Sequence, residues 1–355
     1  MRINLLAGLM LALMLGTASA DTNLNGAGAT FPNPIYSKWF SEYHKQHPNV
    51  AINYQSIGSG GGIKQIQTGT VDFGASDGPM DDKQLSETPF RLLHIPTVLG
   101  ADVPMYNIPG VNAELKFTGD VLADIFLGKI TKWNDPRLAK ANPGVKFPDM
   151  DVVVVHRTDG SGTTYIWVDY LCKVSAEWKS KVGKGTSVNW PVGLGGKGNE
   201  GVAGTVKQTP GSIGYVELIY AVSNNMPFGS VQNAAGEFVK ASLDSVTAAA
   251  ASVKDMPEDF RVSITNAPGK AAYPISSFTW LLVPVEWKDA AKEKAFVDFL
   301  NWMVDKGQGM TSSLQYAPLP KNVAAKVKAR IKEIRVKQEE KKAANKQDTK
   351  QSAKK

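Results

Sequence analysis

The segment Arg157–Thr164, with the sequence RTDGSGTT, most strongly constrains how this chain can fold. It follows the β-branched run Val152–Val155, which predicts a buried strand, and it precedes an apolar helical pattern that begins at Tyr165. A helix that starts directly after a strand gathers unpaired backbone N–H groups and the positive end of the helix dipole in one place. The glycines allow close approach to the backbone, and the hydroxyls and Arg157 add donors. The segment is typical of an anion site, and a Ser/Thr helix cap beside a surface ion pair is the alternative.

The same arrangement occurs twice more along the chain. Gly58–Gly62 follows the predicted strand Val50–Gln55 and precedes the helical pattern Ile63–Thr68. Gly26–Phe31 leads into two prolines that suit a first helical turn, and the predicted helix Pro34–His47 follows. We expect the three helix starts to converge on one oxyanion. Glycine- and serine-rich helix starts that do not converge are the alternative, because they are common in α/β proteins.

The N-terminal residues indicate secretion. Residues 1–20 combine Arg2, the apolar run Leu5–Leu15 and an A-x-A motif before Asp21, which is the pattern of a secretory signal peptide. We expect a mature chain that begins at Asp21 and is soluble in a bacterial periplasm. Cys172 is the only cysteine, so no disulfide within the chain is expected.

Positive charge gathers at the C-terminal end. Residues 321–355 contain thirteen Lys/Arg and four Asp/Glu, a net charge of +9, whereas the whole chain has +7. An apolar repeat predicts a basic helix from residue 321 to about Lys342, followed by a disordered, solvated tail. The repeat consists of Val323, Val327, Ile331 and Ile334. Attraction of this tail to anionic lipid is the alternative.

Strand and helix patterns alternate through the rest of the chain, which predicts an α/β fold. Further predicted strands are Val71–Ala75, Thr97–Val103, Ile213–Val216 and Phe278–Val283. Further predicted helices are Ala176–Val182 and Ala290–Val304.

Two motifs resemble sites of other chemistry. Gly193–Gly198 satisfies the dinucleotide fingerprint G-x-G-x-x-G, but Trp190 and Pro191 before it disfavour a strand, and Asn199 after it does not begin a clear helix. We therefore predict a loop. Ser161 lies between glycines, but the full G-x-S-x-G motif is absent and no histidine follows it in the chain, which disfavours an acyl-transfer enzyme.

Four segments, in this order, closely resemble the periplasmic phosphate-binding proteins, the substrate receptors of phosphate-specific ABC transporters. The likeness covers about residues 24–320. The segments are Gly26–Pro32, then Gly58–Gly62 with Val71–Asp77, then Phe126–Pro136, and last Arg157–Thr163. The chain departs from the family at Gly60, where some members have serine, and in its longer and more basic tail.

The resemblance implies two α/β lobes joined by a hinge that the chain crosses twice, with the ligand in the cleft between the lobes. Lobe one would comprise residues 21–104 and 271–320, and lobe two residues 105–270. The implied protein is a monomer that binds inorganic phosphate and passes it to membrane permease subunits. We expect no catalytic activity, no cofactor and no nucleic-acid partner.

The resemblance also implies a set of ligand residues from both lobes. Lobe one would supply Thr30, Phe31, Ser59 and Asp77. Lobe two would supply Arg157, Ser161, Gly162 and Thr163. Phe31 and Gly162 would act through their backbone N–H groups, and Asp159 would orient Arg157.

Asp77 suits an anion only if that anion has a proton to donate. Phosphate at neutral pH retains a P–OH group, which a carboxylate can accept, whereas sulfate has none. We therefore expect the carboxylate to reject sulfate. For Asp77 alone, a turn role before Gly78 and Pro79 is the alternative. Arsenate, which also has a proton, is an alternative ligand, and a secreted phosphatase on a similar scaffold is an alternative of another class.

Overall fold

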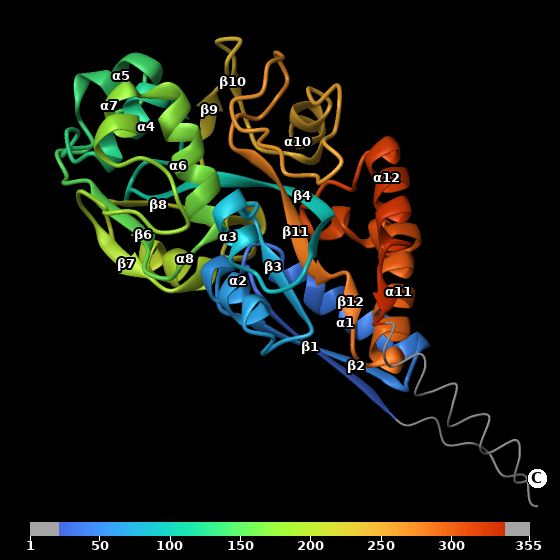
Figure 1. The fold of residues 1–355 in the computed structure, drawn as a ribbon. Coiled ribbons are helices and arrows are strands. Elements are labelled where there is room, and N and C mark those ends of the chain that lie inside the picture. The colour runs from blue at the N-terminus through green and yellow to red at the C-terminus, as the bar shows by residue number, and fades with distance from the viewer. Residues whose placement is uncertain (1–20, 338–355) are drawn as a thin grey trace, which may run out of the picture.

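The computed structural model describes residues 21–337. One curled sheet of eight strands runs through it in the order β2-β1-β3-β11-β4-β8-β6-β7, with helices packed around it (Figure 1). The predicted signal peptide and the end of the basic tail lie outside the described residues. Within residues 21–337, no helix is long and apolar enough to cross a membrane.

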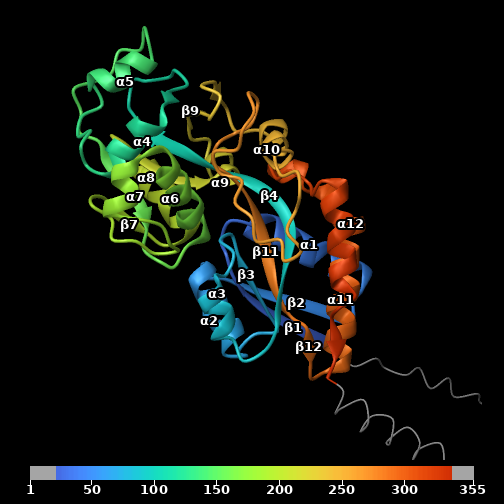
Figure 2. The ribbon, with the colours of Figure 1, turned by 45° about the horizontal axis from the view of Figure 1, so that its top comes forward.

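Strand β4 (Leu92–Asn107) belongs to both halves of this sheet. It pairs antiparallel with β11 (Ser276–Pro284) as far as Ala101, and with β8 (Ser212–Glu217) from Asp102 onward. Figure 2 shows β4 as a long curved ribbon that links the two halves of the molecule. The half that contains β11 is called lobe one, and the half that contains β8 is called lobe two.

The chain returns to lobe one directly beside β4. The Asp102 N–H donates to the carbonyl of Ile275 at 2.9 Å, and the Tyr273 hydroxyl donates to the carbonyl of Asp102 at 2.8 Å. The two crossings therefore lie side by side, and the predicted two-lobed α/β fold is confirmed.

Lobe one contains the parallel strands β1 and β2, with β3 between β1 and β11. The strands are β1 (Thr22–Gly28), β2 (Val50–Ser56) and β3 (Phe73–Ser76), with the short pair β12 (Glu286–Trp287) and β13 (Arg335–Val336). Its helices are α1 (Asn33–Gln46), α2 (Ser59–Gln67), α3 (Asp82–Ser86), α11 (Ala290–Asp305) and α12 (Lys321–Ile331), with two 3₁₀ turns at Gly307–Met310 and Ser312–Leu314.

Lobe two contains the rest of the large sheet and a small three-stranded sheet. The strands are β6 (Val153–Arg157), β7 (Leu194–Gly196), β5 (Lys116–Phe117), β9 (Ser230–Gln232) and β10 (Phe238–Val239). The helices are α4 (Gly119–Phe126), α5 (Pro136–Ala141), α6 (Gly162–Val174), α7 (Ala176–Lys181), α8 (Gly198–Gln208) and α9 (Leu218–Ser223). Helix α10 (Leu243–Ala250) packs against β4 and β11, near the crossings.

Aromatic packing holds α1 on lobe one. The apolar face of α1, which includes Ile35, Trp39 and Phe40, is buried. Its Phe40 ring lies 5.3 Å from that of Phe299 on α11, and the Phe73 ring of β3 lies 4.7 Å from that of Phe296 (centroid distances). This packing fixes the direction in which the start of α1 points.

The strands and helices predicted from the sequence are all present, and the main difference in length is β4, which extends well beyond Thr97–Val103. Strand β1 was not predicted. It lies between β2 and β3 and pairs with both of them.

The predicted loop at Gly193–Gly198 is wrong. Residues 194–196 form β7, which pairs in parallel with the end of β6, and α8 begins at Gly198. The strand starts after Pro191, so the proline removes none of its hydrogen bonds. A Cβ on Gly196 would lie 2.7 Å from the Val202 nitrogen, so this glycine permits close packing of strand and helix. The close packing of β7 against α8 accounts for this glycine of the G-x-G-x-x-G pattern without a bound dinucleotide.

The predicted basic helix is also too long. Helix α12 ends at Ile331, and β13 follows it and pairs in parallel with β12. Ile334 is buried although it lies beyond the helix. The backbone after Ile331 forms strand hydrogen bonds in place of helical ones. The Arg335 N–H donates to the carbonyl of Val285, and the Lys337 N–H donates to the carbonyl of Trp287, each at 2.9 Å.

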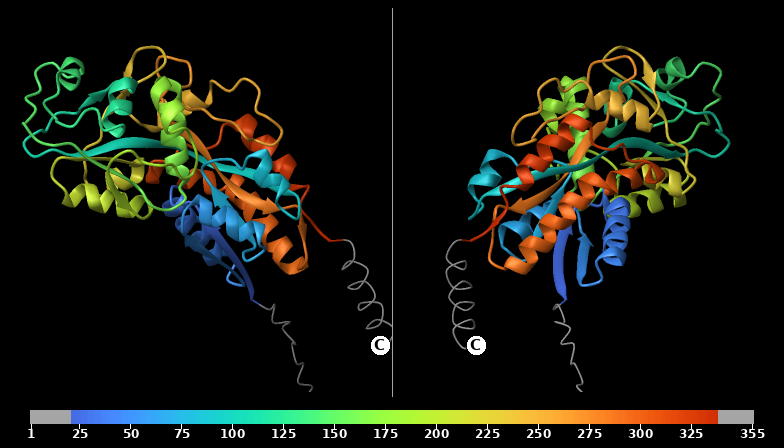
Figure 3. Two further views of the ribbon diagram at one scale, coloured as in Figure 1. Left: turned by 60° about the vertical axis from the view of Figure 1, so that its left-hand side comes forward. Right: turned by 90° about the vertical axis from the view of Figure 1, so that its right-hand side faces the viewer.

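The apolar face of α12 contributes to the core of lobe one. Val323, Val327 and Ile331 are buried, and α12 contacts α11, with Lys328 paired to Asp305 at the end of α11 (Figure 3, red and orange). Replacing Ile331 with alanine should lower the free energy of unfolding by about 2–5 kcal/mol, because it leaves a cavity in place of a fully buried side chain. Urea titration checks this. The exposed Lys321→Ala on the same helix is the control, and an equal effect of both would contradict the packing role.

Candidate functional site

The starts of three helices meet where the two lobes touch. A Cβ placed on Gly162, the first residue of α6, would lie 2.4 Å from both the Ser59 Oγ at the start of α2 and the Asp77 Oδ2 after β3. The Asn199 side chain of α8 joins Thr30, which precedes α1, to Thr163 of α6. The structure thus brings together Thr30, Ser59, Asp77, Gly162 and Thr163 from both lobes.

Arg157 is a buried cation that Asp159 holds in place. The guanidinium donates from Nε to Asp159 Oδ1 at 2.8 Å and from Nη2 to Oδ2 at 2.5 Å. Its Nη1 donates to the Thr163 Oγ1 at 3.2 Å. Burial alone raises the pKa of Asp159, but the hydrogen bonds and charge of Arg157 outweigh it and hold the pKa below its ordinary value. The predicted orienting contact between Asp159 and Arg157 is present.

Asp77 is a buried carboxylate with one oxygen unused. Its Oδ1 accepts from the Thr279 hydroxyl at 2.7 Å, whereas its Oδ2 has no hydrogen-bond partner among the described residues. Burial raises the pKa of Asp77 to about 7, although the bond from Thr279 and the charge of Arg157 oppose the shift. Buried oxygens without partners are uncommon in proteins. Oδ2 is one of seven such buried side-chain atoms within residues 21–337, and its position against the start of α6 marks a place for a donor from a ligand.

Hydroxyl and amide donors gather at the start of α6, whose first residue, Gly162, lies against this oxygen. The Ser161 Oγ accepts from the Thr164 N–H at 2.9 Å and so caps α6, which leaves the hydroxyl proton of Ser161 free to donate. The N–H groups of Gly162 and Thr163 open the helix and have no partner within it. Both residues are buried. These groups suit an anion that the dipole of α6 also favours.

Thr30 and Phe31 are held through their carbonyls. The Tyr220 hydroxyl donates to the Thr30 carbonyl, and the Tyr316 hydroxyl to the Phe31 carbonyl, each at 2.6 Å. Both Thr30 and Phe31 are buried. These bonds fix the orientation of the peptide groups before α1. The Phe31 N–H therefore points in a defined direction.

The backbones of the two lobes touch beside the site. The Gly60 N–H donates to the carbonyl of Gly160 at 2.8 Å. A Cβ on Gly58, whose φ is +90°, would lie 2.3 Å from the Asp159 Oδ2. The structure is therefore a closed form in which glycines allow one loop to lie against the other.

The sequence interpretation missed three kinds of residue at this site. Asn199 bonds two predicted ligand residues, and Thr279 of β11 donates to Asp77. Asp102 and Glu217 are cross-strand neighbours that are fully buried, and burial raises the pKa of both well above their ordinary values. The glycine motif before Asn199 was the available signal, because it marks a helix start like the other three.

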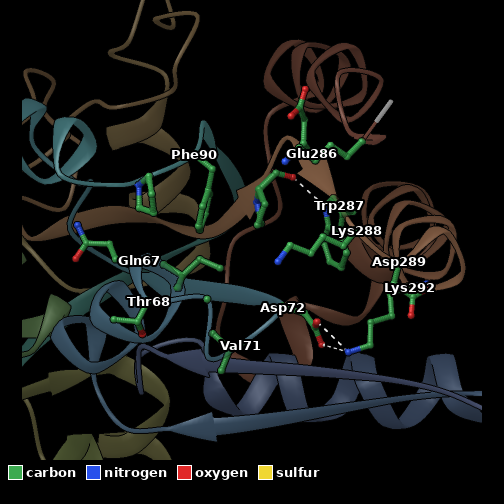
Figure 4. A pocket seen from close by; sticks show the side chains of 15 residues that line it. Gln67, Thr68, Val71, Asp72, Phe90, Glu286, Trp287, Lys288, Asp289 and Lys292 are labelled. Atoms are coloured by element: carbon green, nitrogen blue, oxygen red, sulfur yellow. Dashed lines mark hydrogen bonds and ion pairs between the residues drawn. The ribbon is translucent and has the colours of Figure 1, made fainter. Parts of the chain in front are cut away.

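A surface pocket of about 630 Å³ lies elsewhere on lobe one, between the end of α2 and the start of α11 (Figure 4). None of the predicted site residues lines it. Three lysines and three acidic residues line it, and Lys292 is paired with Asp72 at 3.0 Å. This mixture of charges does not select an anion, so we place the candidate site at the helix starts.

The family follows from comparison with known proteins. A model described as the PBP superfamily domain matches residues 16–306. A phosphate-binding protein PstS from Xylella fastidiosa (strain Temecula1) is 50% identical over 311 residues, which cover 87% of this chain and 85% of the relative. The chain therefore belongs to the PBP superfamily and, within it, to the family of the phosphate-binding proteins PstS.

Solved structures support the same fold. A high-affinity periplasmic phosphate-binding protein, PfluDING, bound with phosphate has a TM-score of 0.68 and 20% identity, and the match covers 87% of this chain and 93% of that one. An ABC-type phosphate transport receptor from Vibrio cholerae has a TM-score of 0.55 and 17% identity, and covers 84% of this chain and 100% of that one. At these identities the likeness concerns the fold.

The raised pKa of Asp77 predicts a pH dependence of stability. The folded protein holds the Asp77 proton more tightly than the unfolded chain, so between about pH 4 and pH 7 the free energy of unfolding should fall as the pH rises. Asp77→Asn should remove this contribution, which amounts to at most about 1.4 kcal/mol per pH unit. Urea titrations of both proteins in anion-poor buffer across this range check it. Parallel pH curves would contradict the raised pKa. Because the Asp77 charge also raises the pKa of Asp102 and of Glu217, the difference between the two proteins includes this coupling.

Proposed function

We propose that this chain is a periplasmic substrate-binding protein that captures inorganic phosphate and delivers it to the permease of an ABC transporter. The single observation that supports this most is the unpartnered Asp77 Oδ2, which lies against the start of α6 beside Ser59 at the start of α2. The printed names of the relative and of the solved structures, which concern phosphate binding and transport, support the same ligand.

The proposed ligand residues are those predicted from the sequence. Arg157, the hydroxyls of Thr30, Ser59, Ser161 and Thr163, and the N–H groups of Phe31 and Gly162 would donate to the phosphate oxygens. Asp77 would accept the phosphate proton. An anion enclosed in a dry site needs a partner for nearly every lone pair, and dipoles can provide most of them without more cations.

Closure of the lobes is part of the proposed mechanism. If donors come from both lobes, phosphate binds the closed form more tightly than an open one and shifts the population toward it. The proposed boundaries are residues 21–104 with 271–320 for lobe one and residues 105–270 for lobe two. The closed pair of lobes would then present a surface to the permease.

We also propose where the protein is located, its oligomeric state and that it is not an enzyme. Residues 1–20 would direct the chain across the membrane and leave a soluble periplasmic protein, which we propose is a monomer. The relatives are named as binding proteins, which supports a receptor over an enzyme. A phosphate-release assay with phosphate esters tests the alternative of a phosphatase, and turnover in that assay would overturn the proposal.

Selectivity tests the role of Asp77. The mature protein should bind one phosphate and should bind sulfate at least ~10²-fold more weakly, because a mispaired buried charge costs about 3–5 kcal/mol. Calorimetric titration with phosphate, sulfate and arsenate measures this, and arsenate should resemble phosphate. Asp77→Asn should narrow the gap between phosphate and sulfate, whereas the exposed Asp149→Asn should leave it unchanged. Equal affinity of the native protein for phosphate and sulfate would refute the role of Asp77.

Arg157 is the only cation in the proposed ligand set. Arg157→Ala should weaken phosphate binding by roughly 2–5 kcal/mol, because it removes one partner of a desolvated charge pair. Arg137→Ala, which removes a surface arginine paired with Asp124 and Asp135, is the matched control and should bind normally. Calorimetry gives the affinities and circular dichroism checks the fold. Normal binding by Arg157→Ala would show that the site is misplaced.

A further inference from the structure

We infer that Asn199 is a positioning residue that turns the hydroxyl protons of Thr30 and Thr163 toward the anion and couples this arrangement to closure of the lobes. The inference rests on the proposed function and adds a residue to its site. Asn199 lies in the first turn of α8 and is fully buried.

The amide nitrogen of Asn199 bridges the two lobes. Its Nδ2 donates to the Thr30 Oγ1 of lobe one at 2.8 Å and to the Thr163 Oγ1 of lobe two at 2.9 Å. A side-chain amide has two N–H donors, so these two bonds use both of them. The hydroxyl oxygens of two proposed ligand residues therefore share one donor group.

The direction of the amide is determined by the backbone. The Glu217 N–H donates to the Asn199 Oδ1 at 2.9 Å. A backbone N–H can only donate, so the atom that faces it has to be the amide oxygen. The amide nitrogen consequently faces the two threonines and cannot exchange places with the oxygen without losing this bond.

This geometry leaves each threonine hydroxyl only one available role. The Thr30 Oγ1 accepts from the Asn199 Nδ2 and also from the Asn199 backbone N–H at 3.2 Å. The Thr163 Oγ1 accepts from the Asn199 Nδ2 and from the Arg157 Nη1 at 3.2 Å. A hydroxyl has two lone pairs and one proton, so with both lone pairs occupied each hydroxyl has only its proton to offer a further partner.

Two consequences follow for the site. Both hydroxyls are set as donors before a ligand arrives, which removes the reorientation that binding otherwise requires. The bonds to Thr30 also exist only when α8 of lobe two lies against lobe one. Opening the lobes breaks these bonds and frees the Thr30 hydroxyl to rotate, so hydroxyl orientation and closure occur together.

A double-mutant cycle tests this inference by calorimetric titration with inorganic phosphate. Asn199→Ala should weaken binding by about tenfold or more, because it releases two donors to the anion from their fixed directions. In a Thr163→Val background the same substitution should have a clearly smaller effect, since one of the two hydroxyls through which it acts is gone. Equal fold-changes in both backgrounds would overturn the inference, because an effect on phosphate that passes through the Thr163 hydroxyl has to shrink when that hydroxyl is absent.

Two controls make the cycle decisive. Ser59→Ala removes another hydroxyl of the same site, one that bonds the Asp77 N–H and not Asn199, so its effect should multiply with that of Asn199→Ala. Asn142→Ala removes a buried asparagine of lobe two whose amide also has three bonds, and it should lower the melting temperature without changing phosphate affinity. Weakened binding in Asn142→Ala would attribute the effect to general destabilisation and overturn the inference.

The same titrations separate the two proposals. If the native protein binds no phosphate, the proposed function fails before any variant is measured. If the native protein binds phosphate and Asn199→Ala binds equally well, only the role of Asn199 fails. Smaller coupling with Thr163→Val than with Ser59→Ala would also contradict the role of Asn199.

Discussion

Strand β4 is one continuous run of backbone that pairs with β11 in lobe one and with β8 in lobe two, and the arrangement of the site depends on it. The pairing changes partner between Ala101 and Asp102, beside the return crossing at Ile275. Any change in the angle between the lobes therefore has to bend these two segments. The site residues stand at strand ends or helix starts of this framework, so their separation across the lobes is set by the angle at the crossings.

Polar groups buried between the lobes make the closed form specific. Thr30 of lobe one is bonded by Asn199 and Tyr220 of lobe two, and Gly60 is bonded by Gly160. Loss of such a partner inside the protein costs free energy. A closed form in which the lobes met at a different position would lose these bonds and is therefore disfavoured. Within residues 21–337 the Asp77 Oδ2 lacks a partner, as do both carboxylate oxygens of Asp102 and the Glu217 Oε1. The proposed phosphate proton would supply the missing partner of Asp77.

The sequence predicted the parts of the fold and site that have a local signature. The segment Arg157–Thr164 and the glycine-rich segment Gly58–Gly62 have such a signature, because in each of them the end of a strand is followed directly by the start of a helix. The partners of Asn199 do not, since Thr30 lies 169 residues away and only tertiary packing joins them. The end of α12 was misjudged for a similar reason: Ile334 continues the helical spacing, and only its pairing partner β12 shows that the helix has stopped. Strand β1 was missed because its glycine-rich end weakens the strand pattern.

The position of the two described chain ends has a practical consequence. Thr22 pairs with Val50 of the edge strand β2 in lobe one, and Val336 pairs with Trp287 on the same lobe. Both ends of the described part of the chain thus lie on lobe one, and the backbone reaches lobe two only through the crossings. If the protein is attached to a surface through either terminus, lobe one is fixed and lobe two can still move. A fluorophore on lobe two would then report the closure of the lobes that accompanies ligand binding.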